Sequence, residues 1–271
     1  MPFAICNEVF EGWAFDRICR FVKSVGYDGL ELAPFTLATP ITDLDAMRRA
    51  ALRRQAEDAG LEIVGLHWML AKTQGFHLTS PDPAVRHRTS GYLRALAEAC
   101  RDLGGRVMVF GSPAQRSLLP GVSEASAFEF AAETIGGAAA AFEACGVTFC
   151  MEPLTRDETD FVNSCDDAVR LIEMVSHPRV VLHLDVKSMS SESTPVPDLI
   201  RRFAHRTGHF HANDPNRRGP GFGDVDFVPI FAALREAGYN QWVSVEPFDY
   251  SPDPETVARQ SLDYMRRCLA G

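Results

Sequence analysis

Four residues with metal-binding side chains each stand at the end of a short apolar segment. They are Glu152, Asp185, His211 and Glu246, which end segments 147–152 (VTFCME), 180–185 (VVLHLD), 208–211 (GHFH) and 242–246 (WVSVE). Successive candidates are 33, 26 and 35 residues apart, about the length of one strand–helix repeat. If they converge, three carboxylates and one imidazole form an O₃N site for a divalent cation. Such hard donors favour Mn²⁺, Mg²⁺ or Co²⁺ over a thiolate-rich zinc or iron site.

The elements that must position these side chains alternate along the chain. Further strands are predicted at 3–6, 29–32, 62–67 and 107–110, and helices at 15–25, 43–59, 83–103, 123–145, 165–175, 196–203, 227–236 and 255–269. Strand–helix alternation indicates a parallel sheet, and eight repeats favour a closed one. We therefore predict an α/β fold, a single (β/α)₈ TIM-barrel domain over residues 1–271. The carboxyl ends of its strands would meet on one face, where such barrels place their chemistry.

Three longer connections, 69–81, 111–121 and 212–225, follow the third, fourth and seventh predicted strands. They fall on the face predicted to carry the site. Long loops in a compact domain are often lids or substrate walls, and we expect that role here.

Glu152 and Glu246 share a local pattern, an apolar strand followed by glutamate and proline. A carboxylate in such a place is costly to bury unless it is paired or metal-bound. One Glu-Pro could simply begin a solvated loop. Two in equivalent positions of the fifth and eighth strands favour a site.

Histidines precede two of the candidate ligands by two residues. His183 lies before Asp185 and His209 before His211, so each shares a face of its strand with the residue that follows. With Asp185 and His211 at the rim, we expect His183 and His209 one layer lower in the barrel, as supporting residues rather than ligands.

Bulk composition narrows the class of protein. The net charge is −9 without a lysine or arginine block, which makes nucleic acid a poor partner. The start, MPFAICNEVFEGW, has no basic region followed by an apolar run, and no apolar stretch reaches the roughly 20 residues that span a bilayer. Seven cysteines without a CxxC spacing suit reduced thiols. We expect a soluble cytoplasmic protein with no membrane partner.

This constellation resembles the xylose-isomerase-like barrel superfamily, and within it the ketose 3-epimerases of the D-tagatose and D-allulose (psicose) type. The resemblance covers most of the chain and is strongest from Glu152 to Glu246. It implies that Glu152, Asp185, His211 and Glu246 hold one metal ion and that the two glutamates are the acid/base pair. It also implies a homodimer or homotetramer. From the donor set, Mn²⁺ is our first expectation for that ion. Separately, no clear Gly-rich phosphate cradle follows the seventh and eighth predicted strands, so we expect a non-phosphorylated sugar as substrate.

Substrate contacts follow from the same resemblance. Glu158 and Arg217 match a glutamate and an arginine that touch the sugar. Ser188 departs from the pattern, because those epimerases carry a histidine there that acts on the carbonyl end of the sugar. Lys187 or His67 could supply the missing polar contact.

The predicted reaction is removal of a proton next to a carbonyl by one glutamate and its return to the opposite face by the other, through an enediolate. Alternatives with the same residues are an aldose–ketose isomerase and an epimerase or lyase acting on 3-oxo sugars or glycosides. More distant alternatives are a DNA-repair endonuclease of the apurinic-site type, opposed by the acidic charge, and a sugar-binding barrel without turnover.

Overall fold

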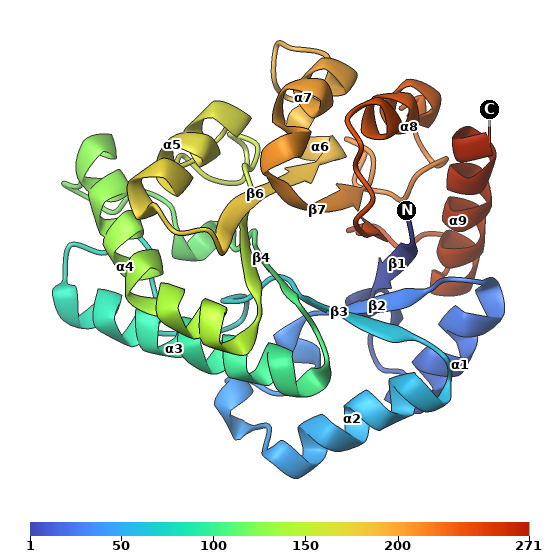
Figure 1. The fold of residues 1–271 in the computed structure, drawn as a ribbon, viewed down its shortest axis with the longest axis horizontal. Helices are drawn as coiled ribbons and strands as arrows, with labels where there is room; N and C mark the ends of the chain where they lie inside the picture. Colours follow the sequence, from blue (N-terminus) through green and yellow to red (C-terminus); the bar gives the residue numbers. More distant parts are fainter. Residues whose placement is uncertain (271) are drawn as a thin grey trace.

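The computed structural model describes residues 1–270 and contains a closed barrel of eight parallel strands in chain order (Figure 1). The strands are β1 (Phe3–Cys6), β2 (Gly29–Leu32), β3 (Glu62–Leu66), β4 (Val107–Phe110), β5 (Thr148–Met151), β6 (Val180–Asp185), β7 (Thr207–Ala212) and β8 (Val243–Val245). Pairing of β1 with both β2 and β8 closes the sheet. The predicted TIM barrel is confirmed.

Helices surround the strands (Figure 1). They are α1 (Phe15–Val25), α2 (Ala46–Asp58), α3 (Pro83–Leu103), α4 (Glu124–Cys145), α5 (Cys165–Val175), α6 (Val186–Met189), α7 (Val196–Phe203), α8 (Phe227–Glu236) and α9 (Pro254–Ala270). Several begin at a side-chain cap, such as Asp82 for α3 and Ser123 for α4, whose oxygens accept backbone N–H groups. Both helices end at a left-handed glycine, Gly104 and Gly146 respectively.

The predicted strands and α-helices agree with the observed ones except near their ends and at α6, and the short 3₁₀ helices were not predicted. The largest difference is at α2, which begins at Ala46 rather than at 43, because Ile41–Asp43 forms a separate 3₁₀ helix and Asp45 caps α2. Segments 147–152 and 242–246 are shorter as strands, yet the N–H groups of Glu152 and Glu246 still donate to Phe110 and Ala212 in the neighbouring strands. Differences of one or two residues at an end are usual. Helix α6 was not predicted, because its four residues are too few to show a helical period. It begins directly after β6, where Asp185 Oδ1 accepts from the Ser188 N–H at 2.7 Å.

The register between β6 and β7 positions the central side chains. Asp185 lies beside His211, and two residues earlier His183 lies beside His209. Both histidines are fully buried inside the barrel, one layer below the first pair, as the two-residue alternation predicts. Polar side chains therefore occupy a part of the interior that most barrels fill with aliphatic ones.

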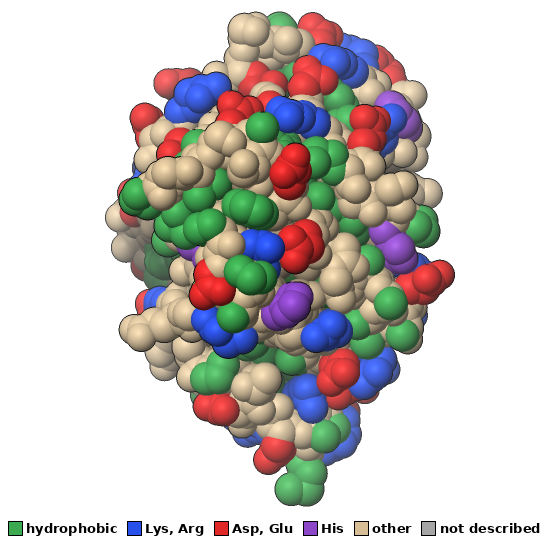
Figure 2. Space-filling model, turned by 90° about the vertical axis from the view of Figure 1, so that its left-hand side faces the viewer, with side chains coloured by type: hydrophobic (Ala, Val, Ile, Leu, Met, Phe, Trp, Pro, Cys, Tyr) green, Lys and Arg blue, Asp and Glu red, His purple; other side chains and the backbone are tan. Residues whose placement is uncertain are grey.

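Acidic and basic side chains are interspersed on the surface turned to the viewer in Figure 2, and neither sign forms a continuous patch there. In the part of the chain that the structure describes, no helix combines the length and apolar character needed to cross a bilayer.

Candidate metal and proton-transfer site

The four predicted ligands lie at the carboxyl ends of four consecutive strands. Asp185 ends β6 and His211 is in β7, while Glu152 and Glu246 directly follow β5 and β8. All four are at most 4% exposed. Burial of this many ionisable groups is costly unless they are paired or hold a cation.

Their donor atoms are close together. Atoms of Glu152, His183, Asp185 and His211 all lie within 4.8 Å of one another. Glu246 joins this group through His211, whose Nδ1 lies 2.9 Å from Glu246 Oε2. The structure thus gathers the predicted ligands around His211 and brings His183 near them, although His183 was expected only as support. Neither ring nitrogen of His183 has a hydrogen-bond partner.

Asp185 is held by contacts to both of its carboxylate oxygens. Oδ1 accepts from the Ser188 N–H, and Oδ2 accepts from the Asn213 amide at 2.5 Å. Asn213 in turn accepts from the N–H of Lys187 at 2.9 Å. Asn213 was not predicted as a site residue. It could have been, because it lies two residues after His211 and therefore on the same face of the chain.

The two glutamates have opposite electrostatic surroundings. Burial, together with the nearby Glu246 and Asp185 carboxylates, raises the pKa of Glu152 well above its ordinary value. Burial would also raise the pKa of Glu246, but the charge and hydrogen bond of His211 hold it below the ordinary value. Two carboxyl groups whose pKa values are pushed apart are typical of an acid/base pair.

The donor set fits a divalent cation. Desolvation raises the pKa of Asp185, and the carboxylates around it repel one another. A bound cation would relieve that repulsion, and the oxygen-rich set with one or two imidazoles suits Mn²⁺, Mg²⁺ or Co²⁺. Cys6 lies near this cluster, within 4.8 Å of donor atoms of Glu31 and His211, and burial raises the pKa of its thiol well above the ordinary value.

A cavity of about 180 Å³ opens over Glu152 and Glu246. Its remaining lining residues are Trp68, Gly111, Pro113, Leu154, Glu158, Arg217 and Phe248. The Trp68 Nε1–H donates to Glu246 Oε1 at 2.8 Å. Two of the walls come from predicted connections, 111–121 (Gly111 and Pro113) and 212–225 (Arg217), whereas no residue of 69–81 lines this cavity. The cavity therefore offers three carboxyl groups, a guanidinium and aromatic faces to one small polar molecule.

The predicted substrate-binding residues differ in their position relative to this cavity. Glu158 and Arg217 line it. Lys187 does not line it but contacts Glu158, since its Nζ donates to both carboxylate oxygens at 2.7 Å. His67 does not line the cavity and is fully buried, with Nε2 2.9 Å from a carboxylate oxygen of Glu8.

Two further buried polar residues were missed, one outside the cavity and one that contacts Glu152. Glu8 follows β1 and had not been singled out. Arg116 is fully buried, and both of its terminal NH₂ groups donate to the carbonyl oxygen of Glu152 at 2.7 Å. Burial lowers the pKa of the Arg116 guanidinium to about 10. No local signal marks Arg116, because its contact spans 36 residues and depends on how the loop after β4 folds.

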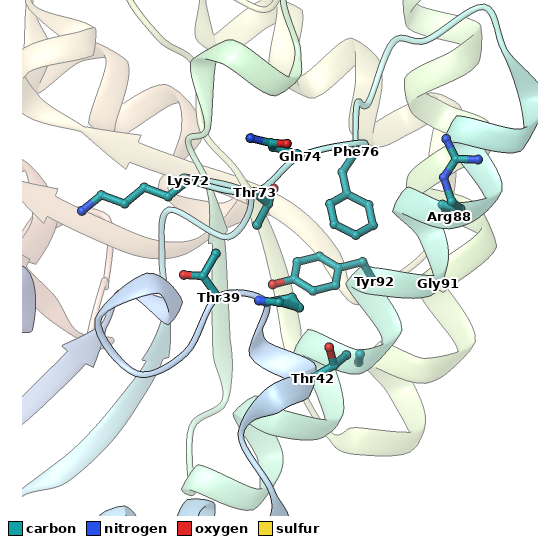
Figure 3. Close-up of a pocket in the computed structure, with 11 residues that line it drawn as sticks. Thr39, Thr42, Lys72, Thr73, Gln74, Phe76, Arg88, Gly91 and Tyr92 are labelled. Atoms are coloured by element: carbon teal, nitrogen blue, oxygen red, sulfur yellow. The ribbon is translucent and has the colours of Figure 1, made fainter.

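A larger cavity, of about 630 Å³, lies beside the barrel mouth, between the loops after β2 and β3 and helix α3 (Figure 3). Phe76 and Tyr92 stack within it with ring centroids 4.4 Å apart. Its lining contains no carboxylate or imidazole. The smaller cavity, over the two glutamates, is therefore the place where proton transfer could occur.

The fold and this buried cluster define a sugar isomerase or epimerase barrel. A family model described as xylose isomerase-like TIM barrel matches residues 19–268, and the chain belongs to that family. It is 30% identical over 231 residues to a D-psicose 3-epimerase of Ruminiclostridium cellulolyticum, covering 84% of this chain and 76% of the relative.

Other relatives act on other sugars. The chain is 24% identical to a 3-dehydro-D-guloside 4-epimerase of Escherichia coli, covering 92% of this chain and 93% of the relative. Among solved structures, a D-psicose 3-epimerase of Clostridium cellulolyticum crystallised with D-tagatose superposes with a TM-score of 0.87 over 99% of both chains, at 24% identity. The relatives are thus carbohydrate epimerases whose names differ in sugar and in carbon.

Proposed function

We propose that this protein is a divalent-metal-dependent ketose 3-epimerase acting on a non-phosphorylated sugar. The observation that carries the proposal is the placement of two buried glutamates, Glu152 after β5 and Glu246 after β8, on one small cavity. General acid/base groups must lie within hydrogen-bond reach of the proton they move. Two such groups held on different strands can address opposite faces of one carbon.

In the proposed reaction, one glutamate removes the proton from the carbon next to the sugar carbonyl and the other returns a proton to the opposite face. Trp68 holds Glu246 through its indole N–H, and Arg116 holds the backbone of Glu152. Glu158 and Arg217 would bind sugar hydroxyls. A cation held by Glu152, Asp185, His211 and Glu246, with Mn²⁺ as our first choice, would supply Lewis-acid stabilisation of the negative charge that develops on the sugar oxygens.

Deuterium exchange tests this proposal. Wild-type protein with Mn²⁺ should convert D-psicose to its C3 epimer in D₂O and place deuterium at C3. E152Q and E246Q should each lower turnover by about 10²–10⁴-fold, the usual contribution of a positioned acid or base, while retaining bound metal. The matched control is E143Q, which changes a glutamate on the exposed side of α4. Near-normal turnover by E152Q or E246Q with metal bound would contradict the proposal.

A second candidate, an epimerase or lyase acting on a 3-oxo sugar or glycoside, is supported by the likeness to a 3-dehydro-D-guloside 4-epimerase and by Ser188, which stands where the ketose 3-epimerases that this chain resembles carry a histidine. Its side chain is buried, and its Oγ has no hydrogen-bond partner. No imidazole stands there to contact the carbonyl end of a free ketose. The ratio of kcat/KM for a 3-oxo-glucoside to that for D-psicose decides between the two, and deuterium at C1 or C2 of an aldose–ketose pair would indicate an isomerase instead.

We also expect a homodimer or homotetramer. Light scattering coupled to size exclusion would measure the mass, and a monomer at all concentrations would contradict this expectation.

A further inference from the structure

Glu31 is a fully buried carboxylate on β2 whose side chain reaches across the barrel interior to β7. Its Oε2 lies 2.7 Å from His209 Nε2, and its Oε1 lies 3.1 Å from His211 Nε2. β2 and β7 are not neighbours in the barrel. Glu31 lines neither cavity described above, so it has no direct access to a bound sugar. Such a group requires an explanation, because a carboxylate without solvent is costly to bury.

The contact to His211 fixes how that imidazole faces the candidate site. His211 Nδ1 points toward Glu246, 2.9 Å from Oε2, and Nε2 points the other way, toward Glu31. A neutral imidazole carries one N–H, and an ionised carboxylate can only accept a hydrogen bond. When Nδ1 gives up its proton to serve as a ligand, Glu31 is the acceptor that keeps the remaining proton on Nε2.

We propose that Glu31 is a positioning residue, which accepts the Nε2–H of His211 and so presents the Nδ1 lone pair to a cation shared with Glu152, Asp185 and Glu246. This inference depends on the cation site of the proposed function, but not on which sugar is turned over. Ligating histidines commonly donate their second N–H to a carboxylate, which fixes both tautomer and ring orientation. Here the carboxylate comes from the opposite half of the sequence.

The alternative is that Glu31 only fills the barrel interior. The affinity for Mn²⁺, measured by calorimetric titration of the metal-free protein, distinguishes a positioning role of Glu31 from a purely space-filling one. The isosteric variant E31Q should bind Mn²⁺ about 10–100-fold more weakly, the usual effect of losing such a partner.

E8Q is the matched control. Glu8 is a second buried carboxylate facing an imidazole, that of His67, and it has no hydrogen bond to His211. E8Q therefore removes the same charge from the same barrel interior, and corrects for the electrostatic part of the effect. E31Q should weaken Mn²⁺ binding at least about tenfold more than E8Q does. Equal affinities in E31Q and E8Q would overturn the proposal.

A spectroscopic readout tests the tautomer directly. In the diamagnetic Zn²⁺ form, ¹⁵N NMR of labelled histidine should show His211 protonated at Nε2 in the wild type, and a weakened or exchanging Nε2–H in E31Q. An unchanged His211 signal in E31Q would overturn the proposal. If E31Q does not fold, E31D replaces it, because it keeps the charge but withdraws the carboxylate by one methylene; wild-type affinity in E31D would count against the proposal.

Failure of the proposed function gives a different result. Wild-type protein that binds Mn²⁺ but epimerises no sugar would refute the enzymatic proposal, and the comparison of E31Q with E8Q would still be decisive for Glu31. Wild-type protein that binds no Mn²⁺ would overturn the inference about Glu31.

Discussion

Replacing Gly111 by alanine should impair Glu152 while leaving its carboxylate chemically intact. Gly111 directly follows β4 and lines the small cavity. A Cβ added there would overlap Glu152 Oε2 and would lie 3.0 Å from Glu152 Cδ. Gly111 is not among the glycines with positive φ, so alanine is compatible with the backbone. The substitution therefore acts on the position of one side chain.

The expected magnitude follows from that overlap. Non-bonded carbon atoms lie about 3.5–4.0 Å apart, so Glu152 Cδ must retreat by about 0.5–1 Å, and Oε2 must move farther. A misplacement of about 1 Å in a reacting geometry costs about 10²-fold in rate, which corresponds to about 2.7 kcal/mol in the activation free energy. We expect kcat of Gly111→Ala to fall by about that factor.

The assay is deuterium incorporation at C3 of D-psicose with saturating Mn²⁺, together with the thermal midpoint of unfolding. Gly136→Ala is the control, because Gly136 lies on the exposed face of α4 with no heavy atom within 4 Å of the added methyl group. It should leave kcat unchanged and stabilise the helix by up to about 1 kcal/mol. A fully folded Gly111→Ala protein with wild-type kcat would refute the reasoning.

Three other predictions concern the same site. Trp68→Phe removes the indole donor 2.8 Å from Glu246 and should lower kcat roughly tenfold or more, since hydrogen bonds to charged groups contribute about 1.5–3 kcal/mol; an unchanged kcat would show that Glu246 needs no such donor. Lys187→Met leaves the Glu158 carboxylate without its ammonium partner and should raise KM for D-psicose roughly tenfold. The control Lys23→Met, on α1, should leave KM unchanged. A wild-type KM for Lys187→Met in steady-state assays would contradict this role. Chelation by EDTA should lower the thermal midpoint, and Mn²⁺ at 100 times its Kd should restore about 2.7 kcal/mol of stability; no shift on addition of Mn²⁺ would argue against a cation site.

The fold could be predicted from sequence because its signals are local. Periodicity, capping residues and glycines at helix ends mark each element within a few positions, as Asp82 and Gly104 do for α3. The candidate ligands could be predicted from the sequence for a related reason. Residues at the carboxyl ends of parallel strands must converge, so Glu152 and Glu246 could be expected near one another before any contact was known.

The contacts that support those ligands could not be predicted. Arg116 reaches the backbone of Glu152 only because of the shape of one loop. The partnership of Glu31 with His211 spans 180 residues and two strands on different sides of the barrel. Such pairs form only where side chains are long enough to meet across the closed barrel, and the spacing of residues along the chain does not predict which of them meet.

The double attachment of Asp185 links the barrel to its rim. One oxygen accepts from the first turn of α6 and the other accepts from Asn213. The segments that follow the neighbouring strands β6 and β7 are therefore hydrogen-bonded to the same carboxylate. A movement of the Asp185 carboxylate, for example on binding a cation, should shift both the Ser188 N–H and the Asn213 side chain. Hydrogen exchange of the amides of residues 186–189 should therefore report whether a cation is bound at the site, without any measurement of turnover.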